Sequence, residues 1–305
     1  MKLPVTNKNI FDMKRLLFVL AIAVMTVMAG CSKDDEKGIS VNNEVRSAFA
    51  QKYPDASHIK WKLKTDYYVA EFTMNYTAPD GSSFKADADA WFDNSGVWYM
   101  TEVDLMPNRI PAAISEALAS SRFAGWKIED AEIVERNGMA VVYVLEVEGV
   151  ENGVKVEYDL YFMTDGTLVK EVLDESDNDD HSDYIPLQIA ETIKNTIAAM
   201  YPGSQIVEIE KEKNYTEVDI LHNGVKKEVL FTDQGVWVST KYDVSSSVLS
   251  SAIQSLLSTA YADYYIDDVD KVETTDGEYY EIELEKRAGS GEITIMVKAD
   301  GTLIQ

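Results

Sequence analysis

The chain is poor in cysteine: Cys31 is the only one among 305 residues. A single cysteine forms no disulfide within the chain, so the fold depends on packing alone. Histidine is scarce as well, with three residues in three separate segments (His58, His181 and His222). None of them lies in a zinc-ligand spacing such as His-Glu-x-x-His, which argues against a zinc site.

Basic residues are also under-represented, because 28 lysines and arginines face 53 aspartates and glutamates. The formal net charge of −25 repels phosphate backbones and excludes nucleic acid as a partner. The sequence holds no Gly-x-Ser-x-Gly nucleophile turn and no glycine-rich phosphate loop. We therefore predict no catalytic residues, no cofactor and no enzymatic activity.

The first thirty residues differ from the rest and predict a signal peptide. Met13 is the expected start, followed by basic Lys14 and Arg15 and by an uncharged apolar run over residues 16–29. That run is shorter than the roughly 20 residues that a membrane-spanning helix needs. Small residues then precede Cys31, as at a secretory cleavage site. The alternative is a core helix that ends in a buried free cysteine.

Residues 31–42 follow as a charged tether, and residues 43–305 contain a fourfold repeat. Each copy has an apolar strand, a turn with glycine and a second strand. The four turn glycines are Gly96, Gly166, Gly235 and Gly301. Glycine adopts the positive φ that a tight turn requires. Four such turns in register are strong evidence for repeated structural units.

Each copy also opens on a stretch with apolar residues at helical spacing, over residues 43–53, 110–122, 186–201 and 246–261. Alternating strands follow each stretch. We expect an α+β fold in which each unit is a helix packed on a four-stranded antiparallel sheet. The first and third copies share Tyr-Pro and Gly-Val-Trp, whereas the second and fourth share Asp-Gly-Thr-Leu, so the copies form pairs.

Two domains are therefore expected, at residues 43–174 (units 43–106 and 107–174) and 185–305 (units 185–244 and 245–305). The acidic segment 175–184 between them predicts an exposed linker. Its carboxylates are also weak candidates for calcium ligands. These candidates are Asp177, Asp179, Asp180 and Asp183.

One apolar position recurs next to each turn. Phe92, Phe162, Phe231 and Val297 should face the helices, so the preceding residues should face the other way. These preceding residues are Trp91, Tyr161, Leu230 and Met296. Either the sheets cover them by packing on each other, or they form a surface for a partner. Trp61 is a further candidate for that surface.

The combination of motifs resembles the PepSY-like, beta-lactamase-inhibitor-like lipoproteins of Gram-negative gut bacteria. The resemblance rests on Ala29-Gly30-Cys31, on the helix that ends at Tyr53-Pro54, on the strand with Trp61 and on the glycine turns. It implies lipidation of Cys31, and it implies sheets that offer a concave face to a partner. Lys33-Asp34-Asp35 further resembles a tag for export to the cell surface, although a plain solvated tether explains it equally well.

We therefore expect a monomeric lipoprotein that contacts the outer membrane only through its lipid, on the periplasmic or outer side. Its expected role is to bind a protein or peptide of the envelope, and inhibition of a hydrolase is one specific form of that role. The alternative is a structural or accessory lipoprotein of an envelope complex.

Overall fold

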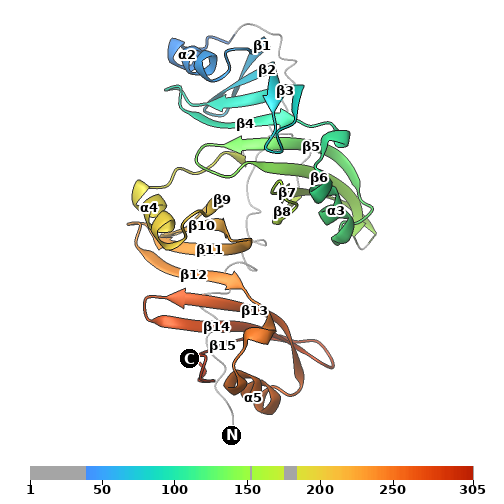
Figure 1. Cartoon of the computed structure of the whole chain (residues 1–305), viewed down its shortest axis with the longest axis vertical. Coiled ribbons are helices and arrows are strands. Elements are labelled where there is room, and N and C mark those ends of the chain that lie inside the picture. Colours follow the sequence, from blue (N-terminus) through green and yellow to red (C-terminus); the bar gives the residue numbers. More distant parts are fainter. Residues whose placement is uncertain (1–38, 152, 175–183, 305) are drawn as a thin grey trace, which may run out of the picture.

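The computed structural model describes residues 39–151, 153–174 and 184–304 (Figure 1). The chain forms four helix-on-sheet units, with the first at one end of the long axis, the fourth at the other, and the second and third overlapping in height between them. The helices are α2 (Asn43–Lys52), α3 (Ala112–Ser120), α4 (Glu191–Met200) and α5 (Ser251–Ala260). The fold is α+β, as the sequence predicted.

The strands form two antiparallel sheets, here called sheet A and sheet B. Sheet A has eight strands in chain order: β1 (Ser57–Lys64), β2 (Tyr67–Thr77), β3 (Ser83–Phe92), β4 (Trp98–Asp104), β5 (Lys127–Arg136), β6 (Val142–Glu151), β7 (Val154–Phe162) and β8 (Leu168–Asp174). Sheet B has seven: β9 (Gln205–Glu212), β10 (Tyr215–His222), β11 (Val225–Thr232), β12 (Trp237–Asp243), β13 (Tyr264–Thr274), β14 (Gly277–Lys286) and β15 (Glu292–Val297).

Pairs of units share one continuous sheet, which the repeat alone did not predict. The last strand of one unit pairs with the first strand of the next, β4 with β5 and β12 with β13. In the described part of the fourth unit only three strands form, followed by an isolated bridge between Val297 and Leu303. In each pair, two units therefore become one wide sheet, of eight or seven strands, that carries two helices on the same face.

Three of the predicted helices begin later than expected, and α3 does so by two residues, at Ala112 rather than at residue 110. Helix α4 begins at Glu191 rather than at residue 186, and α5 begins at Ser251 after a separate short 3-10 helix at Ser246–Val248. Ser250 caps α5, because its hydroxyl accepts a hydrogen bond from the amide of Ile253 at 3.2 Å. This capping fixes the start of the helix beyond the point where the apolar spacing begins.

The turn glycines pack against the helix of their own unit. Gly96, Gly166, Gly235 and Gly301 have φ between +76° and +89°. At Gly166 an added Cβ would lie 2.5 Å from the carbonyl oxygen of Ala113, in the first turn of α3. At Gly96 it would lie 2.9 Å from the carbonyl oxygen of Glu44 in α2. Here glycine provides both the positive φ and the close approach of turn and helix.

In the first and third units, the tyrosine of Tyr-Pro and the tryptophan of Gly-Val-Trp both form hydrogen bonds with one threonine, and we call these three residues the trio. The Tyr53 hydroxyl and the Thr101 hydroxyl form a hydrogen bond, and Trp98 Nε1 donates to Thr101 Oγ1 at 2.8 Å. In the third unit Tyr201 and Trp237 donate to Thr240 Oγ1 at 2.8 and 3.0 Å. Both threonines are fully buried. Each trio joins the end of a helix to the fourth strand of its unit.

We predict that replacing Thr101 or Thr240 with valine lowers the free energy of unfolding by about 1–3 kcal/mol, because the tyrosine and the tryptophan of the trio both lose their hydrogen-bond partner. Equilibrium denaturation followed by tryptophan fluorescence measures this. Thr73→Val is the control: Thr73 donates to Asp87 at an exposed position, so its change should stay within about 0.5 kcal/mol. Equal stability of all three variants would contradict the role of the trio.

The core on the helix side differs between the sheets. In sheet A one apolar cluster extends beneath both α2 and α3, whereas sheet B has two separate clusters beneath α4 and α5. Polar contacts occupy the strip between those two clusters. The ammonium of Lys227 lies 3.0 Å from the ring centroid of Tyr242, whose hydroxyl donates to Glu273 at 2.8 Å. The two units of sheet B are therefore joined partly by a cation–π contact and an aromatic hydroxyl.

Candidate functional site

The recurring apolar position points away from the helices, but two of its four residues are covered by the chain itself. Trp91 is fully buried and Tyr161 is 6% exposed, in a cluster on the helix-free face of sheet A. Ile185, Val207 and Leu221, from beyond the predicted linker, complete that cluster. Tyr184, the last residue of the linker, also belongs to it and is buried, which corrects the expectation of exposure at this residue. Of the two alternatives for Trp91 and Tyr161, the structure shows packing within the chain, and their burial contradicts a partner surface at these two residues.

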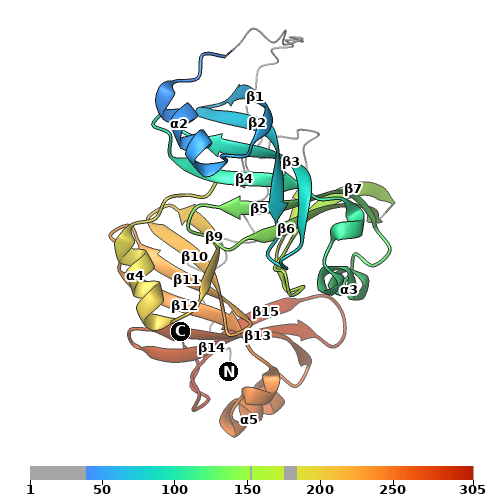
Figure 2. The same ribbon diagram turned by 45° about the horizontal axis from the view of Figure 1, so that its top comes forward.

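Hydrogen bonds fix how the two sheets meet, with β9 lying beside the hairpin of β5 and β6 (Figure 2). The amide of Ala140 donates to the carbonyl of Ile206 at 2.7 Å, and Arg136 Nη2 donates to the carbonyl of Val207 at 2.9 Å. Lys170 forms an ion pair with Glu208. The apolar packing between the two sheets is therefore supplemented by hydrogen bonds and an ion pair.

The other sequence candidates lie in different places. Leu230 and Met296 are half-buried and belong to sheet B. Trp61 lies on the helix side of sheet A, with its ring 5.3 Å from that of Phe49. A register shift in β1 between Ser57 and Lys60 decides the side on which Trp61 lies. The structure does not bring these three residues together with Trp91 and Tyr161.

The part of the helix-free face of sheet A beyond this cluster holds a groove of about 510 Å³. Lysines of β1 line one side of it, namely Lys60, Lys62 and Lys64. Carboxylates of β2 to β5 line the rest, namely Glu71, Asp87, Asp89, Glu102, Asp104 and Glu132. The sequence signal for it was the alternation of lysine and apolar residues in β1 and of aspartate and alanine in β3. We call this site the charged groove.

Like charges face each other across neighbouring strands in the groove. Glu71 is opposite Asp89, and Asp89 is opposite Glu102. Directly opposed like charges destabilise a sheet. The pKa of Asp89 is raised to about 6 by burial and then by the charges of Glu102 and Glu71, which Lys62 and Lys64 partly offset. The groove therefore concentrates negative charge behind a basic rim.

The raised pKa of Asp89 predicts a pH dependence of stability. Because the folded-state pKa is above the unfolded value, the contribution of Asp89 is fully present below about pH 3.9 and is lost as the pH rises through about 6. The free energy of unfolding of the natural chain should therefore fall, relative to that of Asp89→Asn, between pH 4 and pH 7. Urea denaturation of both chains across this range measures the difference, and a constant difference would contradict the prediction.

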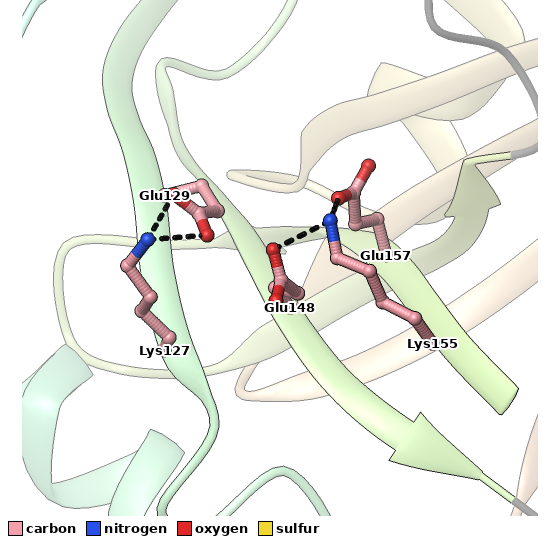
Figure 3. Close-up of polar contacts among 5 residues, drawn as sticks. All are labelled: Lys127, Glu129, Glu148, Lys155 and Glu157. Carbon is pink, nitrogen blue, oxygen red and sulfur yellow. Dashed lines mark hydrogen bonds and ion pairs between the residues drawn. The ribbon is translucent and has the colours of Figure 1, made fainter. Parts of the chain in front are cut away.

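Further along the same face, charged residues of β5, β6 and β7 are paired with one another (Figure 3). Lys155 contacts Glu148 and Glu157 at 2.8 Å each, and Lys127 contacts Glu129 at 2.6 Å. The lysine side chains are well exposed, so salt screens these pairs. The open end of the face is therefore a solvated surface with charges of both signs.

Some of the sequence candidates fall outside the described residues. These are Cys31 with its signal peptide, and Asp177, Asp179, Asp180 and Asp183 of the linker. Within the described residues no group of three or more potential ligands is arranged to hold a metal ion. None of the helices described there is long and apolar enough to cross a membrane.

The chain matches a protein family described as "Putative beta-lactamase-inhibitor-like, PepSY-like" over residues 66–170, 179–226 and 215–305. No curated protein gave a match. Among solved structures, a BLIP-like protein from Bacteroides fragilis is 31% identical, with 48% of this chain and 96% of that chain covered and a TM-score of 0.39.

A DUF2874 family protein from Bacteroides ovatus is 27% identical over 48% of this chain and 95% of its own, with a TM-score of 0.40. A Bacteroides eggerthii structure described as "putative periplasmic proteins" is 25% identical over 44% and 88% of the two chains, with a TM-score of 0.36. Each relative thus covers about half of this chain. Because the family match extends over most of residues 66–305, the chain belongs to the PepSY-like, beta-lactamase-inhibitor-like family.

Proposed function

We propose that the protein is a non-enzymatic lipoprotein of the bacterial envelope that binds a protein or peptide through the charged groove of sheet A. The groove is the observation that carries this proposal. It is the part of the helix-free face that the second sheet leaves uncovered, and it holds opposed like charges that a purely structural sheet has no reason to keep. Charged groups arranged in this way select a partner by electrostatic complementarity.

Anchoring through a lipid on Cys31 is part of the same proposal and rests on the sequence before and at that residue. The Bacteroides eggerthii relative, described as "putative periplasmic proteins", supports an extracytoplasmic location. The family description and the BLIP-like relative from Bacteroides fragilis support inhibition of a hydrolase as one form of partner binding.

Capture of partners from envelope extracts tests the proposal. The full mature chain is compared with Asp87→Ser/Asp104→Ser, which removes two carboxylates from the groove. The control Asp276→Ser/Glu278→Ser removes the same charge from exposed residues at the turn between β13 and β14. We expect one protein to be enriched by the natural chain and the control and lost with the groove variant. Equal enrichment of that protein by all three chains would contradict the proposal.

One observation favours a second function, that of a structural or accessory lipoprotein of an envelope complex. The burial of Trp91 and Tyr161 shows that the largest apolar residues of the helix-free face serve packing within the chain. On this alternative, deletion of the protein alters envelope integrity, whereas the groove variant has no effect on it.

A further inference from the structure

In the part of the chain that the structure describes, the first strand of sheet A has an open edge. β1 is the outermost strand in the order β1 to β8 and pairs with β2 on one side. Among the described residues no strand pairs with its other side. The main-chain groups along an open edge are able to pair with another extended chain.

The side chains of this edge alternate in chemistry. Lys60, Lys62 and Lys64 face the charged groove, while Ile59 and Leu63 lie on the other face and are 44% and 56% exposed. Three lysines within five residues are unusual in a chain with almost twice as many acidic as basic residues. The edge therefore offers positive charge on one face and apolar surface on the other.

Strand β2 shows which side chains fit beside such a strand. Glu71 lies opposite Lys60 and forms an ion pair with Lys62, and Ala70 lies opposite Trp61 on the helix side. A strand added at the open edge would meet the same alternation. Acidic residues on its groove face would lie about 5 Å from the lysines, a spacing at which opposite charges stabilise a sheet.

We propose that the open edge of β1 binds an extended segment of a partner protein in which acidic and apolar residues alternate, added to sheet A as a ninth strand. This rests on the proposed function and names the chemistry of the partner segment. Main-chain hydrogen bonds supply much of the affinity in this mode of recognition, and alternate side chains supply the specificity.

Lysines on edge strands also serve to prevent strands from pairing between copies of a protein. The two roles predict opposite results. If the lysines only guard the edge, their removal increases self-association of the chain. If they select an acidic strand, their removal weakens binding of that strand.

The test uses a fluorescent heptapeptide of alternating glutamate and valine, titrated with the full mature chain and followed by fluorescence anisotropy. A heptapeptide of the same composition with the glutamates and valines in two blocks controls for charge alone. The variant is K60S/K62S/K64S, and its matched control is K85S/K211S/K298S, which removes three exposed lysines elsewhere.

We expect the alternating peptide to bind the natural chain and the matched control about tenfold more tightly than the edge variant. The block peptide should bind the natural chain and the matched control at least about tenfold more weakly than the alternating peptide does. The inference is overturned if the natural chain binds both peptides with equal affinity, or if the edge variant binds the alternating peptide as well as the natural chain does. Self-association of the edge variant without a loss of peptide binding overturns it as well.

The groove variant Asp87→Ser/Asp104→Ser separates this inference from the proposed function. It keeps the three lysines, so it should bind the alternating peptide at least as well as the natural chain does. Suppose that this variant loses partner capture while the natural chain binds no alternating peptide. That result would support the proposed function and refute the added strand.

Discussion

Replacement of Trp91 with alanine is expected to lower the free energy of unfolding by about 3–5 kcal/mol. The indole is fully buried where the two sheets meet, and its Nε1 donates to the buried carboxylate of Glu102 at 3.1 Å. The substitution opens a cavity between the sheets and removes a donor from a buried charge, and both effects destabilise the fold. Urea denaturation followed by circular dichroism measures the change.

Two further variants separate the causes. Trp91→Phe retains a large apolar ring but loses the donor, so it should cost less than Trp91→Ala. Leu230→Ala alters the equivalent position of the third unit, where the side chain is only half-buried, and it should cost less than about 2 kcal/mol. Similar losses at Trp91 and Leu230 would contradict the burial of Trp91 between the sheets.

Replacement of Gly166 with alanine should destabilise the chain through two effects. Its φ of +89° costs a residue with a side chain about 1–3 kcal/mol. In addition, the new Cβ would lie 2.5 Å from the main-chain oxygen of Ala113, so the turn and α3 must move apart, at a further cost of about 1–3 kcal/mol. Denaturation of the full mature chain measures the total.

The matched control is Gly138→Ala. Gly138 has φ +78°, but an added Cβ would meet no atom within 4 Å, so only the strain in φ remains. The loss at Gly166 should therefore exceed that at Gly138 by about 1–3 kcal/mol. Equal losses would show that the close approach of turn and helix contributes nothing.

The units were predictable because their signals are local. A glycine turn between two alternating strands and a helix ended by Tyr53-Pro54 depend on a few neighbouring residues. The positive φ at Gly166 and the helix that ends at Lys52 follow from such short-range chemistry. The α+β class and the order of elements required nothing more.

The candidate site was harder to predict, because burial depends on what packs from elsewhere in the chain. Trp91 and Leu230 occupy the same position in two units, yet the first is fully buried and the second is not. The two sheets meet through the helix-free face of sheet A and through Val207 of β9 and Leu221 of β10, whereas Leu230 lies on β11 outside this contact. Pairing also matters: Trp61 lies opposite Ala70 of the helix-side cluster, beyond a register shift between Ser57 and Lys60 that the sequence did not reveal.

The sequence by itself determined the number and kind of units, the acidic character of the chain and the prediction of a lipid at its only cysteine. The tertiary structure decided that pairs of units share one sheet and that Trp91 and Tyr161 join the two halves. It also decided that no other described residue covers the charged groove or pairs with the outer edge of β1. The reason is physical. Turns and periodicities are set over a few residues, whereas the cover of a sheet face comes from distant residues such as Val207, which belongs to the same buried cluster as Trp91.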